Sequence, residues 1–188
     1  SMRKTAGLLR YPALILFAII LFFESGFEGA QGNFTVSYLS DKEGMSMASA
    51  TLAMTWFTVG MLAGRLPLGF ILGKLGAIGT LYSYLSAALA GVMLLLLCSG
   101  SVFAAYLSMI LIGFGVGATY PVILNYIGGA FRELSGTAIS IALFIALLGQ
   151  YTFNKLTGAA FDAGRQMLLP VLLVVAVACM MTDRKSTR

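Results

Sequence analysis

Two acidic residues lie inside a strongly apolar stretch near the start of the chain. Glu24 and Glu28 follow the run YPALILFAIIL, and Gln31 and Asn33 come soon after them. Spacings of four and three residues place Glu24, Glu28 and Gln31 on one face of a helix. In a membrane-spanning helix, each charged side chain that faced lipid would cost about 2.5–3.5 kcal/mol. We therefore predict that this face looks into a helix bundle or a water-filled cavity.

Carboxyl and carboxamide groups in such a cavity can bind a polar solute or carry a proton. A carboxyl group takes up and releases a proton as its contact with water changes, which is the chemistry of proton coupling. Glu28 is the stronger candidate because it lies further than Glu24 from the expected cytoplasmic end of the helix. The residues leave one alternative open, in which the acids form a structural hydrogen-bonded pair or reach water at the membrane surface.

Two later apolar stretches also carry isolated polar residues. Tyr120, Pro121 and Asn125 occur in GATYPVILNYIGG, and Gln150 and Asn154 lie one helical turn apart in LLGQYTFNKLTG. Neutral amides inside a membrane commonly join helices by hydrogen bonds, so any single one of them favours a packing role. Together with the face that carries Glu24 and Glu28, they predict a polar cavity.

Several kinds of function lack the residues that they need. The chain has no histidine, which excludes His-based metal sites and His-based catalysis. Cys98 and Cys179 both lie in apolar stretches and are expected to be packing residues rather than a disulfide. The sequence also lacks the long cluster of Lys and Arg residues that would indicate nucleic-acid binding. Because no nucleophile motif or phosphate loop is present, we expect no enzyme activity, cofactor or metal.

The composition predicts the environment of these residues. Of the 188 residues, 59% are hydrophobic and only 10% are charged, and the mean hydropathy is +0.93. A soluble domain would carry about 25% charged residues, so the chain is expected to be an integral membrane protein in contact with lipid. A helical span needs about 20 apolar residues, which leaves room for about six spans.

Six apolar segments form one expected domain over residues 1–188. Their length and even apolarity favour helices over barrel strands, which would alternate. The connections are too short for a soluble domain. The expected spans are Leu8 to Leu39, Ser46 to Leu72, Ile78 to Leu97, Val102 to Ile127, Ser135 to Leu156 and Gln166 to Met181.

Basic residues predict the orientation of these spans. Cytoplasmic connections carry an excess of Lys and Arg, and an even number of spans puts both termini on the same side. The expected location is the plasma membrane, the inner membrane of a bacterium, with both termini in the cytoplasm. The inner set is then Arg3, Lys4, Arg10, Arg65, Lys74, Arg132, Arg184, Lys185 and Arg188, and the outer set is Lys42, Lys155 and Arg165.

Glycines are numerous, at 22 residues, and many lie inside the expected helices. Small residues let helix backbones approach closely in lipid, so we expect most of them to serve tight packing. The densest group lies in GMLAGRLPLGFILGKLG, where glycines surround Arg65 and Lys74. Arg65 is expected near the cytoplasmic end of the second helix. There it could cap helix carbonyls or pair with an acid on a partner domain, and a solvated basic loop is the other interpretation.

This segment resembles the signature that joins the second and third helices of each half of major facilitator superfamily transporters. Gly69, Lys74 and Gly76 match that frame. Gly73 stands where the signature usually has an acid, so the charge latch that the acid supplies is not expected here.

The resemblance extends over nearly the whole chain. FESGFEGAQGNFTVSYL is similar to the first helix of the second half of fucose-permease-like members, in which Gly26, Glu28, Gly32, Tyr38 and Leu39 hold matching places. GFGVGATYPVILNYI and the later TGAAFDAG are also similar to that half.

The resemblance implies an all-α membrane protein that is the C-terminal half of a twelve-helix transporter. Such a half is a bundle of six transmembrane helices made of two inverted three-helix repeats, and its first and fourth helices line a central cavity. The implied partners are a missing N-terminal half or a second copy of the chain, together with a small polar solute, of which a sugar is one candidate. The implied gating or loop residues are Gly60, Gly64, Arg65, Gly69, Lys74 and Gly76.

The expected function is therefore half of a proton-coupled secondary transporter that works by alternating access and is inactive when isolated. Two alternatives stay open: a non-transporting scaffold or receptor-like subunit, and a half-size transporter that works as a homodimer. The residues expected to bind solute or protons are Glu24, Glu28, Gln31, Asn125, Gln150 and Asn154.

Overall fold

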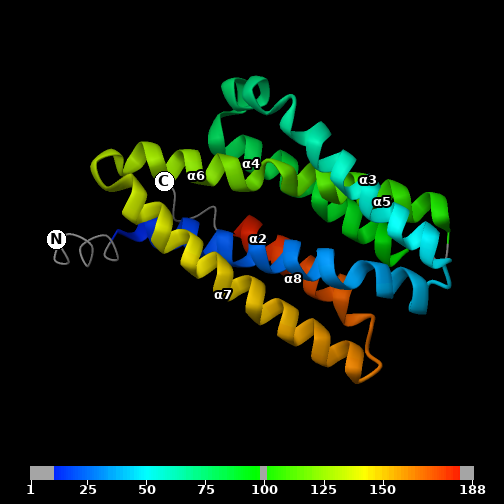
Figure 1. Ribbon diagram of the computed structural model, residues 1–188. Helices are drawn as coiled ribbons and strands as arrows, with labels where there is room; N and C mark the ends of the chain where they lie inside the picture. The colour runs from blue at the N-terminus through cyan, green and yellow to red at the C-terminus, as the bar shows by residue number, and fades with distance from the viewer. Residues whose placement is uncertain (1–10, 98–100, 183–188) are drawn as a thin grey trace.

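The computed structural model of the chain describes residues 11–97 and 101–182, and these residues form a bundle of helices without strands (Figure 1). The expected all-α class is confirmed for this part of the chain. The expected features that fall outside the described residues are the start of the first span, Cys98, and the basic residues Arg3, Lys4, Arg10, Arg184, Lys185 and Arg188.

The helices follow one another with short connections. In chain order the elements are α2 (Pro12–Ser37), the π-helical turn η1 (Tyr38–Lys42), α3 (Met47–Arg65), α4 (Leu68–Leu96), α5 (Val102–Gly117), α6 (Thr119–Ala130), the 3-10 turn η2 (Arg132–Leu134), α7 (Ser135–Asp162) and α8 (Leu168–Thr182).

Five stretches of the described chain are helical, long and apolar enough to cross a membrane. They are Ala13–Lys42, Met47–Arg65, Leu68–Leu96, Val102–Ala130 and Arg132–Asp162, and a shorter apolar helix covers Leu169–Met181. A helix rises about 1.5 Å per residue, so the five longer stretches match the hydrocarbon thickness of about 30 Å. The described bundle is thus consistent with an integral membrane protein.

The second helix ends earlier than the expected boundary at Leu72. It stops at Arg65, and α4 begins at Leu68 after a turn at residues 66–67. Pro67 explains the stop, because proline has no backbone N–H to continue the ladder. Within α4 the backbone kinks at Gly76, whose φ of +68° is readily adopted only by glycine. The residues between Leu68 and Gly76 therefore form a separate helical segment.

The fourth expected span, Val102 to Ile127, is broken within its length. α5 ends at Gly117 and α6 begins at Thr119. Pro121 lies four residues after Gly117 and cannot donate to the Gly117 carbonyl, and its ring crowds the same carbonyl group. The break therefore follows directly from the position of one proline.

Glycines hold two helix pairs in close contact. α2 packs most extensively against α7, and α3 packs against α5. A Cβ atom at Gly149 of α7 would clash with the backbone of Phe22 in α2, and one at Gly60 of α3 would clash with the backbone of Ile110 in α5. The expected packing role of these glycines is confirmed.

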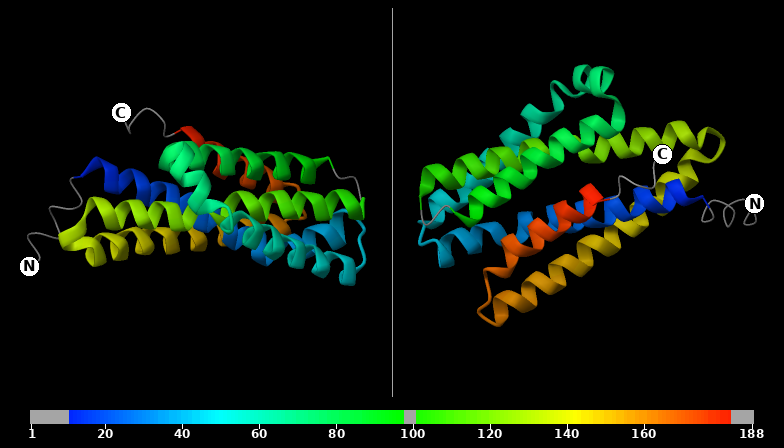
Figure 2. Two further views of the ribbon diagram at one scale, coloured as in Figure 1. Left: turned by 90° about the horizontal axis from the view of Figure 1, so that it is seen from above. Right: turned by 180° about the vertical axis from the view of Figure 1, so that it is seen from behind.

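The bundle has an enclosed centre and an apolar outside. α2 and the α5–α6 span are the most buried of the long helices, whereas α3 and α7 leave most of their residues outside. The exposed side of α7 carries Phe144, Leu148 and Tyr151, as suits contact with lipid. The start of α2 and the α6–α7 connection lie at one end of the bundle, and the α2–α3 and α7–α8 connections lie at the other (Figures 1 and 2).

Candidate functional site

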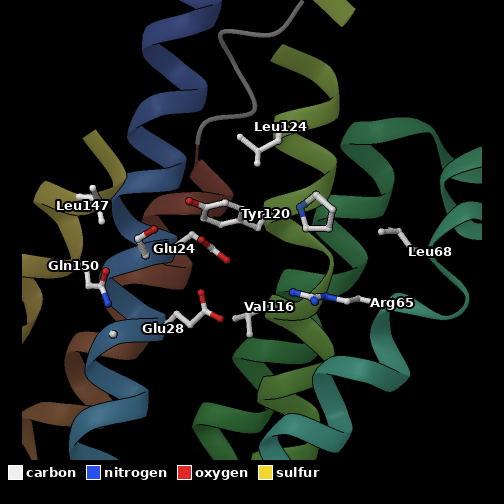
Figure 3. A pocket seen from close by; sticks show the side chains of 12 residues that line it. Glu24, Glu28, Arg65, Leu68, Val116, Tyr120, Leu124, Leu147 and Gln150 are labelled. Atoms are coloured by element: carbon white, nitrogen blue, oxygen red, sulfur yellow. The ribbon is translucent and has the colours of Figure 1, made fainter. Parts of the chain in front are cut away.

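A cavity of about 640 Å³ lies between α2 and the α5–α6 span and is bordered by α3, α4 and α7. Figure 3 shows its side chains at close range. Arg65 and Leu147 in its lining are exposed, so the cavity opens on the surface of the bundle. Its polar side chains belong to Glu24, Ser25, Glu28, Arg65, Tyr120 and Gln150, and its apolar lining includes Leu68, Val116, Pro121, Leu124 and Leu147.

Glu24 and Glu28 project from one side of α2 into this cavity (Figure 3). Glu24 lies near the midpoint of α2 and is 1% exposed, and within the described chain its Oε2 atom accepts no hydrogen bond. Glu28 is half-buried one turn further along. Leaving a buried acceptor unpaired costs about 1–3 kcal/mol. A hydrogen-bond donor that reached the unpaired oxygen would therefore be stabilising.

Arg65 reaches the cavity from the end of α3, on the side that faces the two acids (Figure 3). Its Nε atom donates a hydrogen bond of 3.0 Å to the Gly117 carbonyl. That carbonyl is the one that Pro121 leaves without a helical donor. Of the two roles expected for Arg65, the capping of helix carbonyls is confirmed.

The remaining N–H groups of Arg65 are oriented by this bond. A guanidinium group has five donors in a rigid plane, and fixing Nε fixes the two Nη groups as well. No ion pair joins Arg65 to an acid among residues 11–97 and 101–182. The Nη groups are therefore available in the cavity.

Tyr120 and Gln150 complete the polar lining. Tyr120 lies in the first turn of α6, just before Pro121, and its hydroxyl end is turned toward α2 in Figure 3. Gln150 belongs to α7, and its side chain packs on α2 at Gly29. A Cβ atom added at Gly29 would lie 2.6 Å from the Gln150 Cγ atom. Glycine at position 29 thus lets the amide side chain enter the cavity.

Gln31 shares a helix face with the acids but lies outside the cavity lining. Its side chain is fully buried between α2 and α5, and its Nε2 atom donates to the Met109 sulfur at 2.9 Å. Among the described residues its Oε1 atom accepts no hydrogen bond. The polar face of α2 therefore lines the cavity as far as Glu28, and beyond Glu28 it is buried in the interface between α2 and α5.

The other two amides expected in the cavity lie elsewhere. Asn154 accepts a hydrogen bond of 3.1 Å from Asn33, which links α7 to α2 beside the cavity. Asn125 is exposed on α6 and is not part of the lining. The structure thus gathers Glu24, Glu28 and Gln150 and leaves Gln31, Asn125 and Asn154 outside the cavity.

The glycine-rich segment divides into several roles. Gly60 and Gly64 pack against the backbone of α5. Gly69 has open space where a Cβ would be, Gly76 forms the kink in α4, and Lys74 stacks on the ring of Phe70 at 4.3 Å. Only Arg65 of this segment reaches the cavity among the expected gating residues.

Sequence reasoning did not place Arg65 in the cavity. The available signal was Pro121, because a proline inside a span frees the carbonyl four residues earlier and creates a need for a donor. Arg65 could not be matched to Gly117 from the sequence because the two are far apart along the chain. Ser25 was missed, although Glu28 lies three residues after it at a spacing that brings both side chains to one region of the helix surface.

The collected groups can bind a polar solute and exchange protons. They comprise two carboxyl groups, one guanidinium, one phenol, one aliphatic hydroxyl and one amide around apolar walls. In the described part of the chain, no three His, Cys, Asp or Glu residues gather in a way that could hold a metal.

A scan against models of known protein families finds no match to this sequence, and a search of curated proteins finds none either. The resemblance to major facilitator transporters therefore stays a prediction.

Proposed function

We propose that this chain is one six-helix half of a secondary active transporter that moves a small polar solute by alternating access. The observation that carries the proposal is the open polar cavity with Glu24 and Glu28 in the middle of an otherwise apolar bundle. Acids inside a membrane are costly and usually mark solute or proton pathways.

The open side of the cavity supports the half-transporter proposal. Exposed apolar residues such as Leu147, which is 63% exposed, stand beside the half-buried Glu28 in one lining. A mixed surface of this kind is suited to neither water nor lipid. A second six-helix unit that faced it would close the cavity and bury both kinds of group.

The pattern of helix contacts supports an internal repeat. Suppose that α2 corresponds to the α5–α6 span, α3 to α7, and α4 to α8. The contact of α2 with α7 then corresponds to the contact of α5 with α3. These are the two most extensive contacts in the bundle. The same correspondence relates α2–α8 to α5–α4, which are also in contact. Each of the two main crossings also has a glycine at the contact. Gly149 of α7 lies on the backbone of Phe22 in α2, and Gly60 of α3 lies on the backbone of Ile110 in α5.

In the proposed mechanism Glu28 binds the solute or carries the coupling proton, and Glu24 assists it. Glu28 is the half-buried acid and can exchange with the cavity, whereas Glu24 is held inside the bundle. Gln150 and Tyr120 supply hydrogen bonds from the neighbouring walls. The crossing of α3 and α5 keeps the frame rigid while the two halves rock.

Uptake into proteoliposomes tests the proposal. The chain alone should give no uptake, and the chain with its facing six-helix unit should give uptake driven by a pH gradient. Glu28→Gln should lose the acceleration by the gradient, because the proton carrier is removed, but keep exchange of solute across the membrane when the solute is supplied at a saturating concentration. Normal coupled uptake by Glu28→Gln would exclude the proton role, and uptake by purified monomer alone would exclude the half-transporter proposal.

A further inference from the structure

The charges of the cavity have a consequence for the kind of solute. The acids Glu24 and Glu28 lie on α2, and the guanidinium of Arg65 enters from the side that faces them (Figure 3). No ion pair joins these residues in the described chain. Two carboxyl groups and one guanidinium therefore line one cavity without contacting each other directly.

Arg65 is oriented to bind an anionic group. The Gly117 carbonyl holds its Nε atom at 3.0 Å, and Pro121 keeps that carbonyl available by removing its helical donor. The two Nη groups remain as a parallel pair of donors. Such a pair matches the two oxygens of a carboxylate, in a geometry that lysine cannot provide.

The opposite wall is oriented to bind a cationic donor. Glu28 is half-buried at the cavity, and the Oε2 atom of the 1% exposed Glu24 has no hydrogen-bond partner in the described residues. An ammonium group carries three N–H donors and no acceptor. Its donors match two carboxyl groups that lie one helical turn apart on the same helix.

A neutral sugar fits these charges poorly. When the cavity closes, a solute without charge would leave the guanidinium and the carboxylates unpaired away from water, which is strongly unfavourable. A solute with one positive and one negative group pairs with charged side chains on both walls. Val116 and Leu124 in the same lining offer contact for an apolar body.

We propose that the cavity binds a small zwitterion with an apolar body, of the amino-acid class, with its carboxylate on the Arg65 Nη groups and its ammonium on Glu28 and Glu24. This inference rests on the proposed transport function, but the binding itself needs no transport.

Equilibrium dialysis with the purified chain in lipid nanodiscs tests the inference, with leucine as the probe. Leucinamide lacks the carboxylate, N-acetylleucine lacks the ammonium, and glucose is the neutral sugar. Leucine should bind saturably. Leucinamide and N-acetylleucine should each bind about tenfold or more weakly, the factor expected for losing one charge-assisted hydrogen bond. Glucose should not compete.

Variants identify which wall holds which group. Arg65→Lys keeps the charge but loses the paired donors, so it should weaken leucine about tenfold and leave the weak binding of leucinamide unchanged. Glu28→Gln should weaken the binding of leucine and leave the binding of N-acetylleucine unchanged.

Lys74→Gln is the matched control, because Lys74 is an exposed cation that stacks on Phe70 outside the cavity. Circular dichroism of each variant checks that the bundle is folded.

Three results would overturn the inference. They are no saturable binding of leucine, equal binding of leucine and leucinamide, or binding of glucose in preference to leucine. Glucose binding would leave the transport proposal standing, because transport is measured separately in proteoliposomes. Loss of uptake with retained leucine binding would remove the transport proposal and keep the binding site.

Discussion

The α3–α5 and α2–α7 crossings occupy corresponding positions in the bundle but are built differently. At α3–α5, Gly60, Gly64 and Gly113 all place their backbones directly on the backbone of the other helix. At α2–α7 only Gly149 does so, and elsewhere the contact is made by side chains such as Phe153 on Gly26 and Gln150 on Gly29.

This difference separates a rigid crossing from an adaptable one. Backbone atoms cannot move aside without displacing a whole helix, whereas a side chain can change its rotamer. Gln150 and the Asn33–Asn154 hydrogen bond belong to the α2–α7 crossing. We infer that α3 and α5 form the fixed frame, from which Arg65 reaches the cavity, and that α2 and α7 carry the carboxyl and amide groups that adapt to the solute.

The largest effect is expected at the rigid crossing. A Cβ atom at Gly113 would clash with the Phe57 carbonyl oxygen and approach the Met61 nitrogen at 2.9 Å. Gly113→Ala should therefore force α3 and α5 apart and destabilise the bundle by about 3 kcal/mol, the upper range for overpacking. Reversible unfolding in mixed detergent and SDS measures this. A loss well below 1 kcal/mol would show that the crossing yields.

A smaller effect is expected where Arg65 joins the frame to the cavity. Arg65→Gln should destabilise the bundle by about 1–3 kcal/mol, because the Gly117 carbonyl loses its donor. Pro121→Ala returns the helical N–H and should make the same substitution nearly neutral. The double-mutant cycle in the unfolding assay measures this coupling. Equal losses in both backgrounds would contradict the assigned role of the bond.

The smallest effect is expected at the adaptable crossing. At Gly29 an added Cβ meets the Cγ atom of Gln150 at 2.6 Å, and that side chain can move. Gly29→Ala should therefore change stability by less than about 1 kcal/mol, because better helix propensity offsets part of the repacking. Gly32→Ala is the control, because nothing lies within 4 Å of the added atom. A loss at Gly29 as large as that at Gly113 would remove the distinction between the crossings.

Local patterns in the sequence predicted part of this structure and missed the parts that depend on distant contacts. Helical spacing placed Glu24 and Glu28 on one face correctly, and the run of apolar residues predicted the membrane-type helices. The same spacing could not tell that Gln31 leaves the cavity, because its contact with Met109 depends on where α5 crosses α2. The bond from Arg65 to Gly117 depends on tertiary packing in the same way.

Breaks in the helices were also only partly predictable. Pro67 and Pro121 are visible in the sequence, yet a proline in a membrane helix can be accommodated by a kink as well as by a break. Pro67 accounts for the end of α3 at Arg65, but it does not by itself give the direction in which α4 restarts at Leu68. The position of this turn brings Arg65 to the cavity.

Water access to the acidic face is the most direct test of the central claim, which is an open solute cavity on α2. Cys98 and Cys179 are first replaced by alanine, and a water-soluble thiol reagent is applied to Glu28→Cys, Gln31→Cys and the exposed reference Ser46→Cys. Position 28 should react at a rate close to that of position 46, while position 31 should stay protected between α2 and α5. Protection of position 28 as complete as that of position 31 would exclude an open cavity and favour a closed, non-transporting scaffold.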